Sequence, residues 1–203
     1  MRRALLSVLF LTGAARALAQ PYGNEWIHYG QQYWRFEIAA EGIYRIDSAA
    51  LANAGFPVAT VDPREIQLFN REQQVPIYVE GEADGVFNTG DFIEFRGRKN
   101  DGWKDLDMWD DPAHQNDPYY SLHNDTIRYF LTWNGVEQKL RIANYTNTAF
   151  GLYNPRPWFW SESLQLFVGG YQKGDRTNIE ATDSYMVEGE GWFNATAIAS
   201  TSG

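Results

Sequence analysis

The sequence contains no cysteine and only three histidines, His28, His114 and His123. The absence of cysteine excludes disulfide bonds, thiolate metal sites and a cysteine nucleophile within this chain. None of the histidines has a second histidine or a cysteine at metal-ligand spacing, and a lone histidine is usually structural. We therefore assign no metal-binding or general-base role to any of them.

The short motifs of common enzyme classes are also absent. No serine lies in a Gly-x-Ser-x-Gly elbow, so the sequence does not support a hydrolase nucleophile. The glycine pair Gly169-Gly170 lacks the spacing of a phosphate-binding loop. With no catalytic constellation in its sequence, this chain by itself is not expected to be an enzyme.

Basic residues are in the minority, with 17 Lys and Arg against 26 Asp and Glu and a formal net charge of −9. No basic stripe interrupts this acidity. Such a composition argues against nucleic acid and anionic membranes as partners, whereas it suits solubility or the binding of cations.

Long apolar runs are missing except at the amino terminus. Met1-Arg2-Arg3 supplies positive charge, the stretch Ala4 to Ala15 is almost wholly apolar, and Ala17-Leu18-Ala19 has the small-x-small pattern that signal peptidase recognises. We predict a cleavable secretory signal peptide over residues 1–19; a terminal core helix is the alternative interpretation. The apolar run is shorter than the roughly 20 residues that span a bilayer, so no transmembrane helix is expected in the mature chain.

Cleavage after Ala19 would remove three arginines and leave 184 residues with a formal net charge of −12. No cysteine follows the cleavage site, which excludes a lipoprotein anchor. The protein is therefore expected to be exported and to act outside the cytoplasm.

Aromatic side chains are abundant: eight Trp, twelve Tyr and twelve Phe make up 16% of the residues. Such residues favour the pleated, half-buried surfaces of sheets. We therefore predict a mainly β fold, with an antiparallel β-sandwich-like domain and one short helix over residues 20–150. Residues 151–203 are predicted to start a second β unit, with strands at Ser163–Val168 and Tyr185–Val187, that is truncated at Gly203.

The first predicted strand covers Tyr33–Ile38, where Trp34, Phe36 and Ile38 alternate with polar neighbours and are expected to face the core. Gly42–Ile46 is the next predicted strand, and the two are expected to form a hairpin.

Asp47 or Ser48 is expected to cap a short helix that runs through Ala54, because a side-chain oxygen there can accept from a free backbone N–H. Gly55 and Pro57 follow directly and are predicted to end it.

Two further hairpins are predicted from runs of apolar residues around turn residues. The first joins Glu65–Phe69 to Val75–Val79 through Asn70–Gln74, and the second joins Ile127–Trp133 to Gln138–Ile142 through Asn134-Gly135. Phe92–Phe95 is predicted to be a strand between these two hairpins.

An acidic segment, residues 80–91, has the ligand spacing of a calcium-binding EF-hand loop. Oxygen-bearing groups fall at positions 1, 3, 5, 7, 9 and 12 of the segment, with the backbone carbonyl serving at position 7: Glu80, Glu82, Asp84, Val86, Asn88 and Asp91. Position 1 is Glu rather than Asp, and the flanking residues are predicted strands rather than helices. The segment is therefore either a possible calcium site that staples the hairpin or a solvated acidic turn, in which Gly85 and Gly90 supply positive φ.

A second acidic cluster lies in the long segment 97–120, which is too long for an ordinary connection. Its polar residues are Asn100, Asp101, Asp105, Asp107, Asp110 and Asp111, with Trp103 and Trp109 between them. This cluster is either a second cation site, a surface on which sugars stack, or a solvated loop that its tryptophans pin to the sheet.

The order of these segments resembles the amino-terminal β region of the PorU-type sortases of the type IX secretion system, gingipain-like cysteine peptidases of the Bacteroidetes. The phrases that carry the resemblance are, in order, Glu25–Tyr29, Tyr33–Ile38, Glu41–Ile46, Leu51–Pro57, Ile66–Phe69, Val75–Ile77, Gly90–Gly97, Asn100–Gly102, Asp117–Leu122 and Tyr129–Trp133. The ordered series as a whole is specific.

The resemblance implies an outer-membrane or cell-surface protein that removes carboxy-terminal sorting domains from secreted cargo. The catalytic Cys and His of the family lie in a caspase-like domain further along than this chain extends, so no catalytic residue is transferred to a position here. Implied partners are that peptidase domain, other components of the secretion system and the cargo. Two other functions remain open: a secreted glycan-binding β module, and a calcium-dependent structural module.

Overall fold

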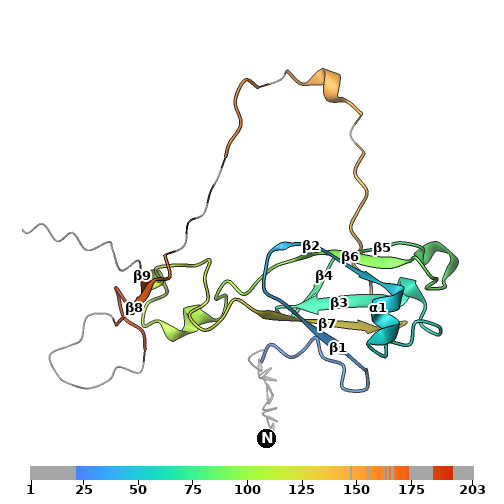
Figure 1. Cartoon of the computed structure of the whole chain (residues 1–203), viewed down its shortest axis with the longest axis horizontal. Helices are drawn as coiled ribbons and strands as arrows, with labels where there is room; N and C mark the ends of the chain where they lie inside the picture. The colour runs from blue at the N-terminus through green and yellow to red at the C-terminus, as the bar shows by residue number, and fades with distance from the viewer. Residues whose placement is uncertain are drawn as a thin grey trace, which may run out of the picture.

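The computed structural model describes residues 22–146, 148–154, 156–161, 163, 165, 167–173 and 185–193. The predicted signal peptide, residues 1–19, lies outside the described residues. The described chain is mainly β, with antiparallel sheets that pack as a sandwich and a single α-helix among the described residues (Figure 1). The predicted fold class is confirmed.

The first sheet has four strands in the order β1-β7-β3-β4. Their bounds are Trp34–Ile38 for β1, Ile127–Trp133 for β7, Ile66–Asn70 for β3 and Gln73–Val75 for β4. The second sheet has the order β2-β6-β5, with bounds Gly42–Asp47, Phe92–Gly97 and Ile77–Val79. Every strand pair in both sheets is antiparallel.

The core lies between the two sheets and is built from their inward-facing side chains together with apolar side chains of the connecting segments. It comprises Ile38, Leu51, Phe56, Val61, Ile66, Leu68, Ile77, Val79, Phe87, Ile93, Phe95, Tyr129 and Leu131. In β1 the predicted alternation is confirmed, because Ile38 is buried and Arg35 and Glu37 are exposed. Full burial of one large apolar side chain contributes about 1.5–3 kcal/mol, so this core supplies the main stabilisation of the sandwich.

The predicted short helix is also confirmed. Helix α1 spans Ser48–Asn53, and the Asp47 side chain caps it by accepting from the Ala50 backbone N–H at 2.7 Å. Leu51 is its buried residue. Gly55 follows with a φ of +76°, the left-handed conformation that ends many helices.

The predicted hairpin between the first two strands is wrong. Strand β1 pairs with β7, with Trp34 opposite Leu131, whereas β2 pairs with β6 in the other sheet. The alternation of apolar and polar residues shows that each strand has one apolar face. It does not show to which of the two sheets the strand belongs, because each sheet of a sandwich buries one face.

The second predicted hairpin exists in a shorter form. Strands β3 and β4 pair across a turn at Arg71 and Glu72, both of which have positive φ, as a two-residue turn of type I′ requires. Pro76 then separates β4 from β5, and the chain passes to the other sheet. The predicted single strand Val75–Val79 is split there because proline has no N–H for a sheet ladder.

The third predicted hairpin is wrong as well. Strand β7 has no free edge, because β1 and β3 occupy its two sides. The predicted partner of β7, Gln138–Ile142, lies instead beside β5: Ile77 N donates to Leu140 O at 3.3 Å, and Ile142 N donates to Ile77 O at 2.9 Å. This pairing is parallel.

Beyond the sandwich, β8 (Gly170–Gln172) and β9 (Gly191–Phe193) form an antiparallel hairpin next to the long loop that follows β6 (Figure 1). Met186 joins the hairpin to this loop by donating to Met108 O at 2.8 Å and accepting from Asp110 N at 3.0 Å. The described residues of Ser163–Val168 are not in a strand, and Tyr185–Val187 contributes only an isolated bridge at Met186. Five 3-10 turns complete the described elements: η1 Pro63–Glu65, η2 Glu82–Asp84, η3 Asp105–Met108, η4 Pro112–His114 and η5 Phe150–Leu152.

Candidate functional site

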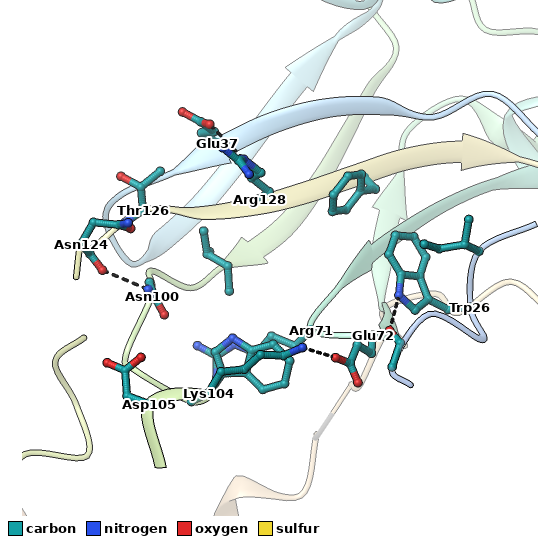
Figure 2. A pocket seen from close by; sticks show the side chains of 15 residues that line it. Trp26, Glu37, Arg71, Glu72, Asn100, Lys104, Asp105, Asn124, Thr126 and Arg128 are labelled. Carbon is teal, nitrogen blue, oxygen red and sulfur yellow. Dashed lines mark hydrogen bonds and ion pairs between the residues drawn. The ribbon is translucent and has the colours of Figure 1, made fainter. Parts of the chain in front are cut away.

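A pocket of about 770 Å³ lies where the amino-terminal segment and the long loop after β6 meet the outer face of the first sheet (Figure 2). Its lining comes from segments far apart in the sequence, including residues 23–27, the β3–β4 turn, residues 100–105 and residues 124–130. It is the concave surface on which we base the candidate site.

Trp26 lies on one side of this pocket. Its indole stacks on Phe69 with ring centroids 5.2 Å apart and contacts Phe130 at the same separation. The indole N–H donates to Gly23 O at 3.2 Å, which fixes the conformation of the amino-terminal segment, while the two ring contacts hold that segment over the sheet. Trp26 therefore covers outward-facing aromatic side chains of β3 and β7 and presents an aromatic wall to the pocket.

The β3–β4 turn supplies a charged wall. Arg71 forms an ion pair with Asp101 at 2.8 Å and donates to Lys99 O at 3.1 Å, which ties the turn to the long loop. Lys104 pairs with Glu72 at 2.5 Å (Figure 2). The side-chain cations of both Arg71 and Lys104 lie over the ring of Trp103, at 5.8 Å and 4.7 Å from its centroid.

The opposite wall carries polar groups from β1, β7 and the loop. Glu37 and Arg128 lie on neighbouring strands and pair at 3.3 Å. Asn100 donates through its amide to Asn124 O at 3.0 Å, and Thr126 follows at the start of β7 (Figure 2). Amide, hydroxyl and carboxylate groups thus border the same space as the indoles.

The long loop is anchored by a buried carboxylate. Asp105 is 6% exposed and accepts from the Ser121 hydroxyl at 3.1 Å and from Leu122 N at 2.7 Å. Gly102 has a φ of +76°, and a Cβ there would meet Asp105 Oδ2 at 2.9 Å and Tyr120 O at 3.1 Å. The loop is therefore a packed structure that holds the pocket residues in place.

The charged groups that line the pocket balance one another. Its cations pair with acids of the chain itself, so little net charge is left for an ionic ligand. Its described lining contains no His, Ser or Cys that could act as a nucleophile or as its base. Aromatic rings beside fixed amides and carboxylates suit a neutral polar ligand with an apolar face.

The predicted calcium loop, residues 80–91, lies elsewhere, between β5 and β6. Its side chains have separate partners within the protein: Tyr78 donates its hydroxyl to Glu80, Arg141 pairs with Glu82 at 2.7 Å, and Asp84 accepts from Val86 N and from the Asn88 amide. Asp91 accepts from Asn88 N at 2.6 Å, and the Val86 carbonyl accepts from the Asn88 amide at 3.4 Å.

No group of three or more His, Asp or Glu that could hold a metal ion occurs in the part of the chain that the structure describes. Binding of calcium at residues 80–91 would require the hydrogen bonds and the ion pair of the loop to be exchanged for metal bonds. Calcium at this loop therefore stays a prediction.

Sequence reasoning missed Arg141, which binds the acidic loop from outside. Besides Glu82, its guanidinium donates to Pro63 O at 3.1 Å, Arg64 O at 2.9 Å and Ile66 O at 3.1 Å. No local pattern marks this arginine, because its partners precede it by some 60 to 80 residues. The only feature of the sequence that pointed to a partner of this kind was the set of acidic residues in 80–91. It indicated that a positive charge would bind there, but not that the charge would be an arginine of the same chain.

The second acidic cluster is dispersed rather than gathered into one site. Asp101 forms the ion pair with Arg71, and Asp105 accepts the hydrogen bond from Ser121. Asp111 caps η4 by accepting from Ala113 N. Trp109 is only 4% exposed and is not available for stacking, whereas Trp103 is 37% exposed at the pocket.

Asp110 and His114 form a pair at 2.8 Å. The hydrogen bond that the protonated His114 ring donates to Asp110 raises the pKa of His114 above its ordinary value of 6.5. The same bond lowers the pKa of Asp110 below 3.8. Both residues lie outside the pocket, in the part of the long loop after β6 that contacts the segment before β9.

Fold and site together define a mainly β, antiparallel sandwich domain with a pocket on one outer face. No family model matches the chain, and no curated protein and no solved structure is significantly similar to it. Of the helices that the structure describes, none has the length and apolarity needed to cross a membrane.

Proposed function

We propose that this chain is the non-catalytic amino-terminal β region of a PorU-type sortase of the type IX secretion system. The phrases that resemble the family fall on the main parts of the sandwich: Tyr33–Ile38 contains β1, Glu41–Ile46 falls within β2 and its approach, Gly90–Gly97 contains β6, and Tyr129–Trp133 lies in β7. The resemblance therefore involves the elements that build one domain and its core.

The observation that carries the proposal is that the ordered, family-like phrases fall on the strands of one packed β-sandwich. The chain has no cysteine, so thiolate chemistry requires another part of the protein. In this proposal the peptidase domain lies further along the polypeptide and removes carboxy-terminal sorting domains from cargo at the cell surface. The sandwich packs against that domain and positions cargo or other secretion components.

The reading frame in the source genome provides the decisive test. We expect the codon for Gly203 to be followed by an open frame that encodes a caspase-like α/β domain with a His and a Cys. An authentic stop codon directly after Gly203 in intact genomic sequence would overturn the proposal.

A cellular test addresses the role of the domain. An in-frame deletion of residues 22–142 is expected to leave cargo with its sorting domain attached, as replacement of the catalytic Cys would. Normal cargo processing by a stably exported deletion variant would contradict a positioning role.

A second candidate function is binding of a neutral saccharide in the pocket of Figure 2. The specific observation is that Trp26 and the partly exposed Trp103 line the pocket together with Asn100 and Glu37. Sugar rings stack their apolar faces on indoles and bond their hydroxyls to amides and carboxylates. A glycan array is expected to show binding that is lost with Trp103→Ala and kept with Trp158→Ala, which removes an exposed indole outside the pocket; an array without hits for the parent chain contradicts this candidate.

A further inference from the structure

The described residues of the stretch 143–161, which we name the aromatic arch, expose an unusual set of large apolar side chains. Leu152 is 83% exposed, Phe159 is 86% exposed and Trp160 is 89% exposed. Tyr145, Tyr153 and Trp158 are also more than half exposed. Singly exposed apolar residues are normal on a protein surface, but a cluster of this kind within one short stretch indicates an interaction site.

The arch leaves the sandwich beside β5 and runs well away from both the sandwich and the β8–β9 hairpin (orange in Figure 1). Near its carboxy-terminal end two rings contact each other: Trp158 and Trp160 meet edge to face with centroids 6.1 Å apart. The Arg156 guanidinium lies 5.3 Å from the centroid of the Trp158 ring. Arg156, Trp158 and Trp160 thus form one local cluster on a stretch that projects from the sandwich.

The charge of the arch distinguishes it from the rest of the chain. From Ala143 to Ser161 the sequence contains a single charged residue, Arg156, in a protein whose formal net charge is −9. An anionic surface would repel the acidic remainder of the chain, whereas a surface without net charge would not. A partner surface for the arch is therefore expected to be uncharged overall and to accept indole, phenol and phenyl rings.

We propose that the aromatic arch inserts its rings into the headgroup region of a zwitterionic phospholipid bilayer. Trp and Tyr concentrate at this level of a membrane because their rings combine an apolar body with a polar edge. Arg156 can meet a lipid phosphate there, as basic side chains near an interface do. This inference is independent of the sortase proposal, because it rests only on the exposure, composition and charge of the arch.

The backbone of the arch limits how deep it can go. Unpaired backbone groups are not tolerated in the hydrocarbon core, so an irregular segment stays at the hydrated headgroup level. Pro155 and Pro157 have no N–H, which reduces the number of donors that lose water on insertion. The contact is therefore peripheral and reversible, and only side chains enter the membrane.

The test is sedimentation of the purified chain with phosphatidylcholine vesicles, together with quenching of tryptophan emission by brominated phosphatidylcholine. We expect the parent chain to bind and to be quenched. A triple variant, Trp158→Ala with Phe159→Ala and Trp160→Ala, is expected to bind at least about tenfold more weakly, because most of the inserted apolar area is removed. The control variant Tyr22→Ala with Tyr29→Ala also removes exposed aromatic rings and is expected to bind like the parent.

Salt and lipid charge separate this mode of binding from electrostatic attraction. Binding is expected to be unchanged between about 0.1 M and about 0.5 M salt, and weaker on phosphatidylglycerol vesicles than on phosphatidylcholine vesicles. The proposal is overturned if the parent chain ignores phosphatidylcholine, if it binds only anionic vesicles, or if the triple variant binds as the parent does. Dimerisation of the parent in gel filtration that the triple variant abolishes, without vesicle binding, would instead assign the arch to contact between two copies of the chain.

Discussion

Arg141 and Glu82 form an ion pair at 2.7 Å that joins the segment after β7 to the acidic loop between β5 and β6. The same guanidinium donates to three carbonyl oxygens around η1 and the start of β3. The positive charge that the acidic loop engages in this structure is thus a side chain of the protein itself.

Replacement of Arg141 by Ala is expected to lower the free energy of unfolding by about 2–3 kcal/mol, because Glu82 and the three carbonyl oxygens lose their donor together. The stability of Arg141→Lys is expected to lie between that of Arg141→Ala and that of the parent chain. An ammonium can pair with Glu82, but it cannot donate to all the acceptors that the planar guanidinium reaches. Urea unfolding measures both effects. The control Arg96→Ala removes an exposed ion pair with Glu41 at 3.8 Å and is expected to change the free energy of unfolding by less than about 0.5 kcal/mol. Equal losses of stability for Arg141→Ala and Arg96→Ala would contradict a special role for Arg141.

Calorimetric titration with calcium distinguishes the two interpretations of residues 80–91. If the loop is an acidic turn whose Glu82, Asp84 and Asp91 keep their partners in the protein, no saturable heat is expected in the parent chain or in Asp84→Ala. A saturable heat in the parent that Asp84→Ala abolishes would establish the calcium site instead. Thermal unfolding with and without a chelator gives an independent readout, because a bound ion stabilises the folded state.

Gly97 is expected to be intolerant of a side chain. A Cβ at this position would lie 2.5 Å from Cδ2 of Tyr44, whose hydroxyl donates to Ala40 O at 2.8 Å and so restrains the ring. Gly97→Ala is therefore expected to cost about 1–3 kcal/mol of stability through overpacking. Gly135→Ala is the matched control and is expected to be neutral, because no other group lies within 4 Å of the place that its methyl group would take. If Tyr44→Ala does not relieve the effect of Gly97→Ala in a double-mutant cycle, the ring contact is not its cause.

The Asp110–His114 pair is expected to make the stability of the long loop after β6 depend on pH. Because the pKa of His114 is raised, the contribution of this residue to stability is fully present below pH 6.5. It is lost as the pH rises through the higher pKa of the folded state. The lowered pKa of Asp110 means that its contribution is present above 3.8 and is lost as the pH falls through the lower folded value. The pair therefore stabilises the loop most between these two ordinary pKa values.

Titration of the His114 ring by NMR measures this effect directly. In the parent chain the midpoint is expected above 6.5, and Asp110→Asn is expected to move it down toward that value. An unchanged His114 midpoint in Asp110→Asn would show that the pair does not determine the pKa.

Local features of the chain could be predicted because each depends on neighbours in the sequence. Asp47 caps α1 through a bond to a residue three positions later, and the alternation around Phe36 follows from the geometry of a single strand. The partners of the strands could not be predicted in this way. Strand β1 pairs with a segment about 90 residues away, and no property of either strand alone selects that pairing over a hairpin with its neighbour.

The candidate pocket could be predicted only in part. The sequence of the long loop indicates Trp103 as a possible stacking residue, but Trp109 in the same loop is buried, and no local pattern marks Trp26 or Arg71 as pocket residues. The sequence by itself determined a mainly β chain rich in aromatic residues, without cysteine chemistry, because composition and periodicity act over a few residues. Only the tertiary structure decided which strands share a sheet, which acidic groups are neutralised by Arg141 and Arg71, and which aromatic rings remain exposed. Each of these depends on contacts between residues that are distant along the chain and meet only when the two sheets close over their common core.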